Sequence, residues 1–364
     1  MRYDVAIVGG GVIGSAAAYE LSSRGVGVVV FDDPRAPARA TSAATGLLVV
    51  GRGGREQTEH ARLAELSLQL FELWVGTLER ELGEDFGFRR GHVLRVAQTD
   101  REAAKLLRAV EVAVKHGGKA RWLSAEEVRG AEPLLTDMPQ SGAAIFETEA
   151  TIDPERFLWG LRKISCRRGG QIILEPVRAL RQVGFRWRVE GEERSVEVEE
   201  VVLAAGFRSM DLAESLGLSL PLYPVRGVAF ASVAPREARF AVTCAGLQMV
   251  PREGQKVLVG STVEKDEYSP VVAPAVLAAL KRQLAALFPW LEQATTIQVR
   301  CGIRPGSKIR RPIVGRIPRY SGLSVAVGHY RSGLALAPLT AQTIREILFH
   351  EPSSGASEVW RWPD

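Results

Sequence analysis

The chain has 364 residues, of which 46% are hydrophobic and 24% charged, and its formal net charge is +5. Because this length exceeds the size at which one hydrophobic core usually stops growing, we expect two domains. The composition is ordinary for a soluble globular protein, and no apolar run is long enough to span a bilayer. Arg2-Tyr3-Asp4 leads directly into an apolar strand, so we expect no signal peptide.

Residue usage limits the compartment and the class of ligand. Three widely spaced cysteines, Cys166, Cys244 and Cys301, suit reduced thiols in a cytoplasm and favour neither a disulfide framework nor a zinc site. Basic and acidic residues are interleaved, so the positive charge indicates a solvated surface rather than a nucleic-acid site. The chain lacks asparagine and prefers arginine to lysine. The first feature predicts a heat-adapted source, while a GC-rich genome explains the second equally well.

The segment from Tyr3 to Asp33 has the pattern of a βαβ unit. The apolar run Val5–Val8 predicts a buried strand of a parallel sheet. It leads into Gly9-Gly10-Gly11-Val12-Ile13-Gly14, which is followed by a helix-forming segment at 15–21 and a second buried strand at 26–31. A glycine-rich turn that follows a strand and opens a helix predicts dinucleotide binding.

Each glycine of this turn has a distinct mechanical role. Gly9 permits the tight turn, Gly11 lets the backbone approach a pyrophosphate, and Gly14 allows the helix to pack closely on the strand. Free N–H groups at the start of the helix then face the phosphates. Asp32, at the tip of the second strand, can accept hydrogen bonds from ribose hydroxyls and would repel a 2′-phosphate. The unit therefore predicts FAD or NAD rather than NADP, and does not distinguish the first two.

Apolar spacing and capping signals predict helices along the rest of the chain. They are expected at 60–82, at 100–115 with Asp100 as the cap, at 124–132 behind a capping box, from Asp153-Pro154 onward, at 273–288 and at 338–350. Short alternating strands are expected between them, and the run Val201–Gly206 is a buried strand of the same character as the first. The dinucleotide-binding domain is therefore predicted to be discontinuous, with a second domain inserted into it.

Several further motifs carry a family resemblance when taken together. They are the glycine turn with Asp32, Ala40 to Leu48, Leu203 to Gly206, Pro224-Val225-Arg226-Gly227, Val250-Pro251-Arg252, Gly260 to Glu264, Gly302-Ile303-Arg304-Pro305 and Gly328-His329-Tyr330-Arg331-x-Gly333. The chain resembles the FAD-dependent D-amino-acid oxidase superfamily, most closely its glycine oxidase and amino-acid dehydrogenase branch, from Tyr3 to about His350. The resemblance selects FAD over NAD.

The resemblance implies an α/β Rossmann-like FAD-binding domain at 1–85, 150–218 and 303–351. An inserted α+β domain at 86–149 and 219–302 would roof the flavin with a mixed sheet, and 352–364 would be a loose tail. The implied activity is oxidation of the C–N bond of a small amino acid or secondary amine, by hydride transfer to flavin N5 and hydrolysis of the imine. Electrons would pass to oxygen or to a quinone-like or dye acceptor. The protein could form a homo-oligomer or a hetero-oligomer, and the sequence does not decide between these and a monomer.

The resemblance also implies site residues by position. The cofactor would be bound, without a covalent link, by Gly9, Gly11, Val12, Ile13, Gly14, Asp32, Asp33, Thr41, Ser42, Gly46, Leu47, Val177, Ala205, Gly206, Arg304, His329, Tyr330, Arg331, Ser332, Gly333 and Leu334. Arg304 would bind the substrate carboxylate with help from Arg331, and Gln248 would face the substrate. The guanidinium fork of Arg304 suits a carboxylate on chemical grounds alone. His329 is expected to support the flavin loop rather than to act as a base.

The chain departs from the family pattern at several positions. Gln248 stands where glycine oxidases usually carry tyrosine, which puts glycine itself in doubt as the substrate. Ser332 stands where the family motif has asparagine. Cys301 is offset by one residue from the position at which related sarcosine oxidases carry their flavin-linked cysteine. The cluster Lys308, Arg310 and Arg311 is expected to be a solvated loop, the alternatives being a site for an acidic substrate, an electron acceptor or a partner subunit.

Other functions share the same motifs. A 2-hydroxy-acid dehydrogenase on this fold would use Arg304 equally well. A non-catalytic flavin-binding subunit of a larger complex, or an RNA-modifying FAD protein, would bind flavin without oxidising small amines. Reduction of the bound flavin by amines or by hydroxy acids separates these alternatives.

Overall fold

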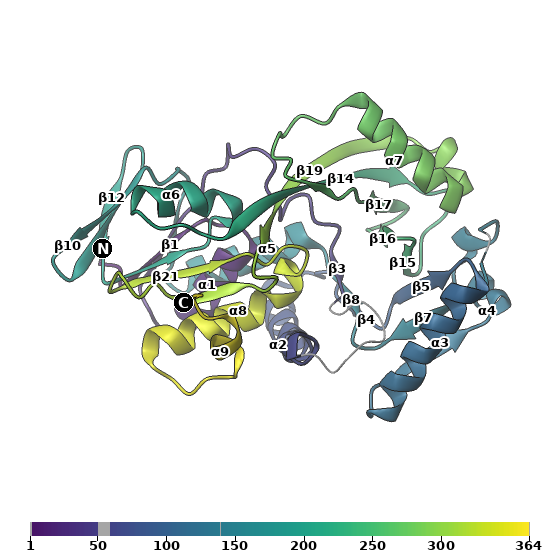
Figure 1. The fold of residues 1–364 in the computed structure, drawn as a ribbon, viewed down its shortest axis with the longest axis horizontal. Helices are drawn as coiled ribbons and strands as arrows, with labels where there is room; N and C mark the ends of the chain where they lie inside the picture. The colour runs from purple at the N-terminus through teal and green to yellow at the C-terminus, as the bar shows by residue number, and fades with distance from the viewer. Residues whose placement is uncertain (1, 50–58, 139, 364) are drawn as a thin grey trace.

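A computed structural model describes residues 2–49, 59–138 and 140–363, and two large sheets dominate it (Figure 1). The first sheet has six strands. In spatial order they are β20 (Ile313–Arg316), β21 (Leu323–Val327), β13 (Glu200–Leu203), β1 (Val5–Val8), β2 (Val28–Phe31) and β9 (Gln171–Ile173). All neighbours are parallel except β20 and β21. Fully buried valine and isoleucine in β1 and β2 explain why both strands are central, with cover on each face.

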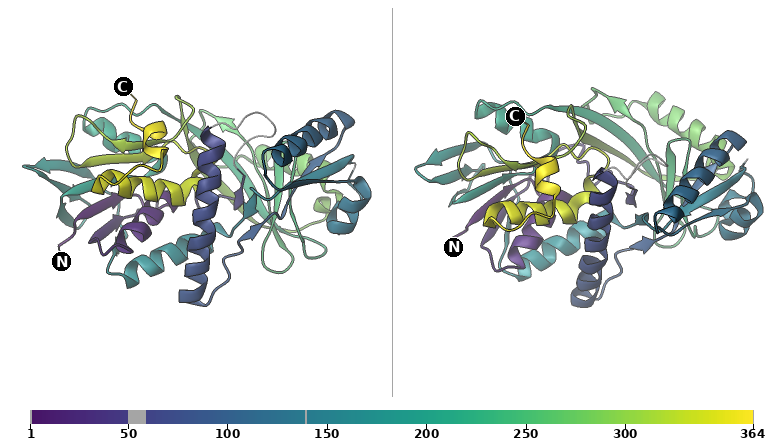
Figure 2. Two further views of the ribbon diagram at one scale, coloured as in Figure 1. Left: turned by 90° about the horizontal axis from the view of Figure 1, so that it is seen from below. Right: turned by 60° about the horizontal axis from the view of Figure 1, so that its bottom comes forward.

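Helices cover one face of this sheet and a small sheet covers the other. On the first face α1 (Val12–Ser22) lies between α5 (Pro154–Arg167) and α8 (Gly333–Phe349). The opposite face packs against β10 (Ala179–Val183), β11 (Arg186–Glu190) and β12 (Ser195–Val198), with the buried Trp187 at the centre, and against α6 (Ser209–Ser215). In Figure 2 the long α2 (Glu59–Leu82) stands beside α8, between the two large sheets.

The second large sheet has nine strands. They are β18 (Glu264–Lys265), β14 (Leu222–Val233), β17 (Lys256–Gly260), β16 (Leu247–Pro251), β15 (Ala241–Cys244), β5 (Val93–Ala97), β7 (Gly142–Phe146) and β6 (Ala120–Leu123), with β19 (Thr296–Ser307) paired to β14. One face packs on α4 (Ala125–Ala131) and α7 (Pro274–Leu287), and the other carries α3 (Asp100–Lys115) at its far end. The long β14–β19 pair extends from this sheet toward the first (Figure 1).

Small elements complete the chain. A three-stranded sheet of β3 (Leu47–Leu48), β8 (Ala150–Thr151) and β4 (Arg89–Arg90) lies where the chain passes between the large sheets. Single 3₁₀ turns occur at Pro133–Leu135, Gly206–Arg208 and Pro289–Glu292. In the part of the chain that the structure describes, none of the helices combines the length and the apolar character that a bilayer crossing requires.

The structure agrees with the α/β fold class and with most expected helices, and corrects three details. The cap of α3 is Thr99, whose hydroxyl accepts from Glu102 N, so Asp100 is already helical. Helix α8 begins at Gly333, and Pro338 lies inside it because the buried face from Leu334 to Ala341 packs on α1 and α2. The C-terminal segment is not a loose tail, since it forms α9 (Ala356–Trp360).

The sources of the strands bear on the expected division into domains. The six-stranded sheet takes its strands from 1–85, 150–218 and 303–351, and the nine-stranded sheet takes nearly all of its strands from 86–149 and 219–302. Strand β19 crosses the expected boundary at 302/303. The division therefore stays a prediction that the sheet membership supports, with β19 shared.

Candidate active site

One large cavity lies between the two sheets and brings the expected site residues together. Its volume is about 2920 Å³, above the roughly 300–1,000 Å³ of ordinary small-molecule pockets. It extends from Asp32 at the tip of β2 to Arg304 on β19. Every expected site residue lines it except Gly14, which packs behind the turn, and Ser42, whose carbonyl accepts from Arg300. The position of Ser42 argues against a direct contact with a ligand.

The glycine turn has the geometry that its sequence suggests. Gly9 has φ +106°, and a Cβ there would lie 2.5 Å from the Cα of Ala205 on the neighbouring β13 connection. A Cβ on Gly14 would collide with the carbonyl oxygen of Gly9, so α1 can only approach β1 with glycine at this position. Gly11 caps α1 and lines the cavity. The turn therefore presents backbone and the start of a helix to the cavity, which suits a pyrophosphate.

Asp32 is buried and is held by residues from three segments. Its Oδ1 accepts from Gly10 N at 3.1 Å, and its Oδ2 lies 2.6 Å from Arg39 and 2.5 Å from Arg162. Burial raises the pKa of Asp32, but Arg162 and Arg39 outweigh that effect and hold the pKa below its usual value. Asp32 is therefore a carboxylate at neutral pH and can accept hydrogen bonds from a ribose.

Sequence reasoning missed Arg39 and Arg162. Arg162 comes from α5 and also donates to the carbonyl of Gly10 and to Ser15 Oγ, so it joins the glycine turn to Asp32. No local signal marks it, because its spacing on α5 is that of an ordinary polar helix position. Arg39 was visible only as part of the loop after β2.

The loop from Ala38 to Leu47 is hydrogen-bonded to the start of α1 and to the nine-stranded sheet. Thr41 Oγ1 accepts from Val12 N at 3.1 Å, and Ala38 O accepts from Ile303 N of β19 at 2.9 Å. Arg252 donates to Thr45 O at 2.6 Å, and burial lowers the pKa of Arg252 to about 10. These contacts place the small residues of the loop along the cavity wall, where a flat ring can lie against them.

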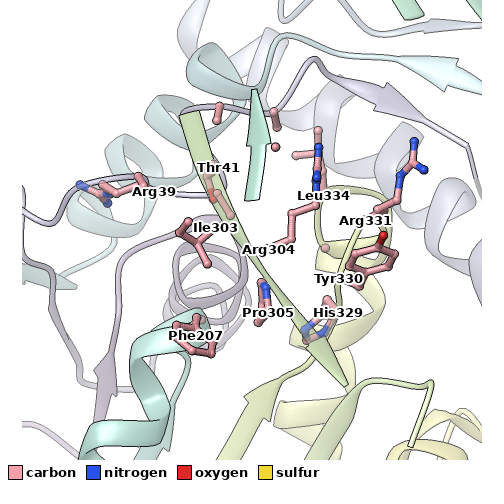
Figure 3. A pocket seen from close by; sticks show the side chains of 18 of the residues that line it. Arg39, Thr41, Phe207, Ile303, Arg304, Pro305, His329, Tyr330, Arg331 and Leu334 are labelled. Atoms are coloured by element: carbon pink, nitrogen blue, oxygen red, sulfur yellow. The ribbon is translucent and has the colours of Figure 1, made fainter. Parts of the chain in front are cut away.

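Arg304 lies on the cavity side of β19. Its guanidinium donates to Ser261 Oγ at 2.8 Å and to Thr262 O at 3.1 Å. It occupies the space that a side chain at Gly227 would fill, since a Cβ there would lie within 2.5 Å of the guanidinium. Burial, and then the nearby charge of Arg331, lower the pKa of Arg304 to about 10. Figure 3 shows Arg304 and Arg331 pointing into the same part of the cavity.

Arg304 is a partly buried cation whose guanidinium contacts no carboxylate among the described residues, although the charge of Glu264 acts on it from nearby. Among the described residues, no carboxylate lies within 4.0 Å of its guanidinium nitrogens, and its hydrogen-bond partners are a hydroxyl and carbonyl oxygens. A buried charge is costly unless it is paired. The arrangement therefore suits an anionic ligand, and the planar fork suits a carboxylate.

The loop from Gly328 to Gly333 is braced from below. His329 is buried, its Nε2 lies 3.0 Å from Thr340 Oγ1, and burial lowers its pKa to about 3. Tyr330 N donates to Pro305 O at 2.9 Å, which ties the loop to β19 beside Arg304. A neutral, buried histidine bonded to α8 supports the loop and is not placed to act as a base.

Gln248 lies on β16, and its Nε2 donates to Thr45 Oγ1 at 2.6 Å. It thus joins the nine-stranded sheet to the loop that lines the cavity. Cys301 is different, because its neighbours from Gly302 to Pro305 line the cavity and it does not. Burial raises the pKa of the Cys301 thiol, and the charges that act on it are those of Arg226, Glu264, Arg304 and Glu267. This position supports a cofactor held without a thioether link.

The basic cluster borders the same cavity. Lys308, Arg310 and Arg311 all contribute to its wall, and Arg311 donates to the carbonyl of Arg361 at 3.0 Å. Lys308 and Arg310 are exposed, as a solvated loop would be. For metals, the described part of the chain brings together no set of three histidine, cysteine, aspartate or glutamate side chains that could hold an ion.

Comparison with known proteins gives the class. A family model described as FAD-dependent oxidoreductase matches residues 4–347, so the chain belongs to the family of FAD-dependent oxidoreductases. The chain is 30% identical over 350 residues to the glycine oxidase of Geobacillus kaustophilus, which covers 95% of this chain and 93% of that protein. It is 28% identical to hydrogen cyanide synthase subunit HcnC of Pseudomonas aeruginosa, over 96% of this chain and 93% of that protein.

Solved structures agree. The crystal structure of the Geobacillus kaustophilus glycine oxidase superposes with a TM-score of 0.91 at 28% identity, covering 100% of this chain and 98% of that one. The iminodiacetate oxidase of Chelativorans sp. BNC1 shares the fold, with a TM-score of 0.86 at 24% identity over 98% of both chains. These findings confirm the predicted family, fold class and FAD cofactor, and they confirm an enzyme that oxidises C–N bonds of small amino acids or amines.

Proposed function

We propose that FAD lies extended along the cavity and that the substrate's carboxylate binds to Arg304, between the flavin and the nine-stranded sheet. Asp32 would hold the adenosine ribose, and the turn from Gly9 to Ile13 would hold the pyrophosphate. The loops at 41–47 and 328–334 would flank the flavin ring. The fit rests on the glycine turn, because its closely packed residues Gly9, Gly11, Val12 and Ile13 line the cavity at the N-terminal end of α1. FAD, when bound, supplies a hydride acceptor for the carbon next to the substrate nitrogen.

The observation that carries the proposal is the partly buried guanidinium of Arg304, which contacts no carboxylate among the described residues. Its contacts with Ser261 and Thr262 fix the fork in one orientation before a ligand binds. With a pKa of about 10, it remains charged at neutral pH. A fixed cation can hold an amino acid by its carboxylate so that the Cα–H bond has a single orientation, and such positioning lowers the barrier substantially.

The chain's residues also favour the neutral form of the substrate amine. Hydride leaves the carbon adjacent to nitrogen only when the nitrogen lone pair is free. Arg304 and Arg331 place positive charge on the cavity wall, and a nearby like charge disfavours an ammonium group. Because His329 is neutral and occupied with Thr340, we assign no side-chain base. Orientation and this electrostatic field are the contributions of the protein.

The test is reduction of the purified holoenzyme without oxygen. Glycine, sarcosine, both prolines and D-alanine are compared with glycolate and both lactates, and loss of the visible flavin absorbance is followed. We expect amines to reduce the flavin and hydroxy acids not to. Reduction by hydroxy acids alone would assign a 2-hydroxy-acid dehydrogenase, and reduction by neither class would assign a non-catalytic flavin subunit. Reoxidation by air, compared with reoxidation by a quinone, then separates an oxidase from a dehydrogenase.

The finer setting of the enzyme is part of the same proposal. The three cysteines are free thiols, and Cys166 is exposed, which supports a reducing cytoplasm. The lack of asparagine supports a heat-adapted source. A melting temperature above about 70 °C would support that origin, because ordinary mesophilic domains melt at about 45–65 °C.

A further inference from the structure

A polar row crosses the nine-stranded sheet beside the substrate end of the cavity. Gln248 of β16 pairs with Thr243 of β15, and Thr243 pairs with Arg95 of β5. Residues paired across adjacent strands share one face of a sheet. On the other side Gln248 pairs with Gly260, which pairs with Ala229. The row therefore reads as two small residues followed by three polar ones, all on one face.

This face is the one that carries Arg304. Arg304 pairs with Val225 of β14, and its guanidinium lies over Gly227, so Val225, Gly227 and Ala229 alternate onto the same side. Gln248, Thr243 and Arg95 all line the cavity with Arg304. Gly260 and Ala229 are buried and closely packed, since a Cβ on Gly260 would lie 2.7 Å from the Cβ of Ala229. The polar side chains follow on the next strands, with Gln248 on β16, Thr243 on β15 and Arg95 on β5.

The neighbouring row on the same face is covered, which sets the polar row apart. Val250, Ala241 and Val93 are two residues further along β16, β15 and β5, and they are buried under Leu47 and Val49. Thr243, Gln248 and Arg95 are only partly buried. The row of Val250, Ala241 and Val93 is thus apolar and covered. The adjacent row exposes the amide of Gln248, the hydroxyl of Thr243 and the guanidinium of Arg95.

Arg95 is held in place rather than free to follow solvent. It forms an ion pair with Glu149, which is 1% exposed, and its guanidinium lies 5.0 Å from the ring centroid of Phe146. Its side chain retains 15% of its exposure, on the cavity side. A buried carboxylate that fixes an arginine at a cavity wall gives a donor of defined direction at modest entropic cost.

We propose that this polar row is a second substrate subsite that binds an sp² oxygen acceptor, carried on the side chain or on the nitrogen substituent of the amino acid. The inference rests on the proposed function and narrows its substrate class. The preferred substrates are amino acids or secondary amines with a second carboxylate or a carboxamide. The hydroxyl of Thr243 and the guanidinium of Arg95 are the donors, and Gln248 borders the path from Arg304 to them.

Strand spacing sets the length of the substrate. The guanidinium of Arg304 touches Ser261, at the end of β17, and β16, β15 and β5 follow in order. Adjacent strands lie about 4.8 Å apart, so Thr243 and Arg95 are about two and three strand spacings beyond that point. The Arg95 guanidinium lies over Phe146 of β7 and is paired with Glu149, so it stays at the far end of the row and Thr243 is the nearer donor. A substrate therefore needs a substituent that carries its oxygen away from the α-carbon along the row, and glycine has none.

The experiment compares matched pairs of compounds by anaerobic flavin reduction, which does not depend on the electron acceptor. Both enantiomers of glutamate and of glutamine are compared with norvaline, which has the same chain without the terminal oxygens. N-(carboxymethyl)glycine is compared with N-ethylglycine. We expect at least one oxygen-bearing compound to reduce the flavin with at least about tenfold higher efficiency than its aliphatic match, the effect of one good hydrogen bond. The preferred pair separates carboxylate from carboxamide.

Two variants assign the preference to the row. Thr243→Val removes the hydroxyl at constant shape, and Arg95→Met is combined with Glu149→Leu so that no buried carboxylate loses its partner. Each is expected to lower the preference ratio at least about threefold. Arg121→Met is the matched control, because Arg121 is exposed in β6 of the same sheet and lies outside the cavity lining. Visible spectra confirm that every variant retains flavin.

The outcomes separate the two proposals. If no amine reduces the flavin, the proposed function fails and the subsite fails with it. If aliphatic and oxygen-bearing compounds reduce the flavin equally well, the proposed function stands and the subsite is wrong. A preference that survives in both variants, or that Arg121→Met also removes, overturns the assignment to this row.

Discussion

The two ends of the cavity treat their key charges in opposite ways. At the nucleotide end Asp32 is compensated within the chain, by Arg39, by Arg162 and by a backbone N–H. At the substrate end Arg304 is bonded only to a hydroxyl and to carbonyl oxygens among the described residues. The nucleotide end is therefore preassembled around its charge, while the substrate end leaves a charge for the ligand to satisfy. Under the proposed function, this difference fits a cofactor that stays bound and a substrate that must leave.

The largest expected effect tests the substrate end alone. Arg304→Ala should raise the apparent substrate constant at least about a hundredfold, because a charge-assisted, bidentate pair is lost. Flavin content and the visible spectrum should not change. Steady-state or anaerobic titration measures the constant, and Arg304→Lys, which keeps the charge without the fork, should be intermediate. An unchanged constant would remove Arg304 from its assigned role.

The second prediction concerns His329, which supports the loop from Gly328 to Gly333, and the measured quantity is the free energy of unfolding as a function of pH. Its pKa falls from an unfolded value near 6.5 to about 3 in the fold. The unfolded chain therefore binds a proton first as pH falls, and the stability that the neutral histidine confers is lost between pH 6.5 and 3. From pH 7 to pH 5 the loss is about 2 kcal/mol. Denaturant unfolding of the wild type and of His329→Gln measures it, and the two pH profiles should differ by that amount.

Arg162 tests the nucleotide end alone. Arg162→Gln should weaken FAD binding about tenfold, the loss of a partly buried charged contact. Without Arg162, Asp32 keeps only Arg39 as a cationic partner and its pKa rises, so the defect should grow as pH falls from 8 to 5.5. Fluorescence of released flavin gives the dissociation constant at each pH. A defect of equal size at every pH would show that Arg162 acts only on packing. Arg167→Gln, on the same helix, is the control.

The smallest expected effect tests how closely the guanidinium of Arg304 is held against Gly227. Gly227→Ala places a methyl group where the guanidinium lies, so Arg304 must move. We expect a rise in the substrate constant of about fivefold to tenfold without loss of flavin, because a displacement of about 1 Å already costs an appreciable fraction of catalysis. In the Arg304→Lys background, whose side chain occupies less space, Gly227→Ala should raise the substrate constant less than it does in the wild type, and such non-additivity would locate the clash at this contact.

Local patterns predicted β1, the glycine turn and α1, because these elements are contiguous in sequence, and the nucleotide contacts assigned to them stay a prediction. Arg304 was found through a motif. The structure adds the reason for glycine at position 227, because the guanidinium of Arg304 occupies the space that a side chain there would need. Arg162 could not be found in this way, since its contact with Asp32 depends on how α5 docks on α1. The polar row required the register of β5, β15 and β16, which no spacing within one strand reveals. Burial of α9 likewise depends on a surface formed by α8 and β20.

Strands β14 and β19 form a long antiparallel pair that connects the nine-stranded sheet with the six-stranded sheet. Each has 12 residues, and Arg304 lies on the second, opposite Val225 of the first. A hinge that lifted the nine-stranded sheet away from the nucleotide fold would have to bend both strands and would carry the carboxylate anchor with it. We therefore expect small molecules to enter and leave through movement of side chains and loops at the rim of the cavity, while the paired strands keep Arg304 opposite Val225.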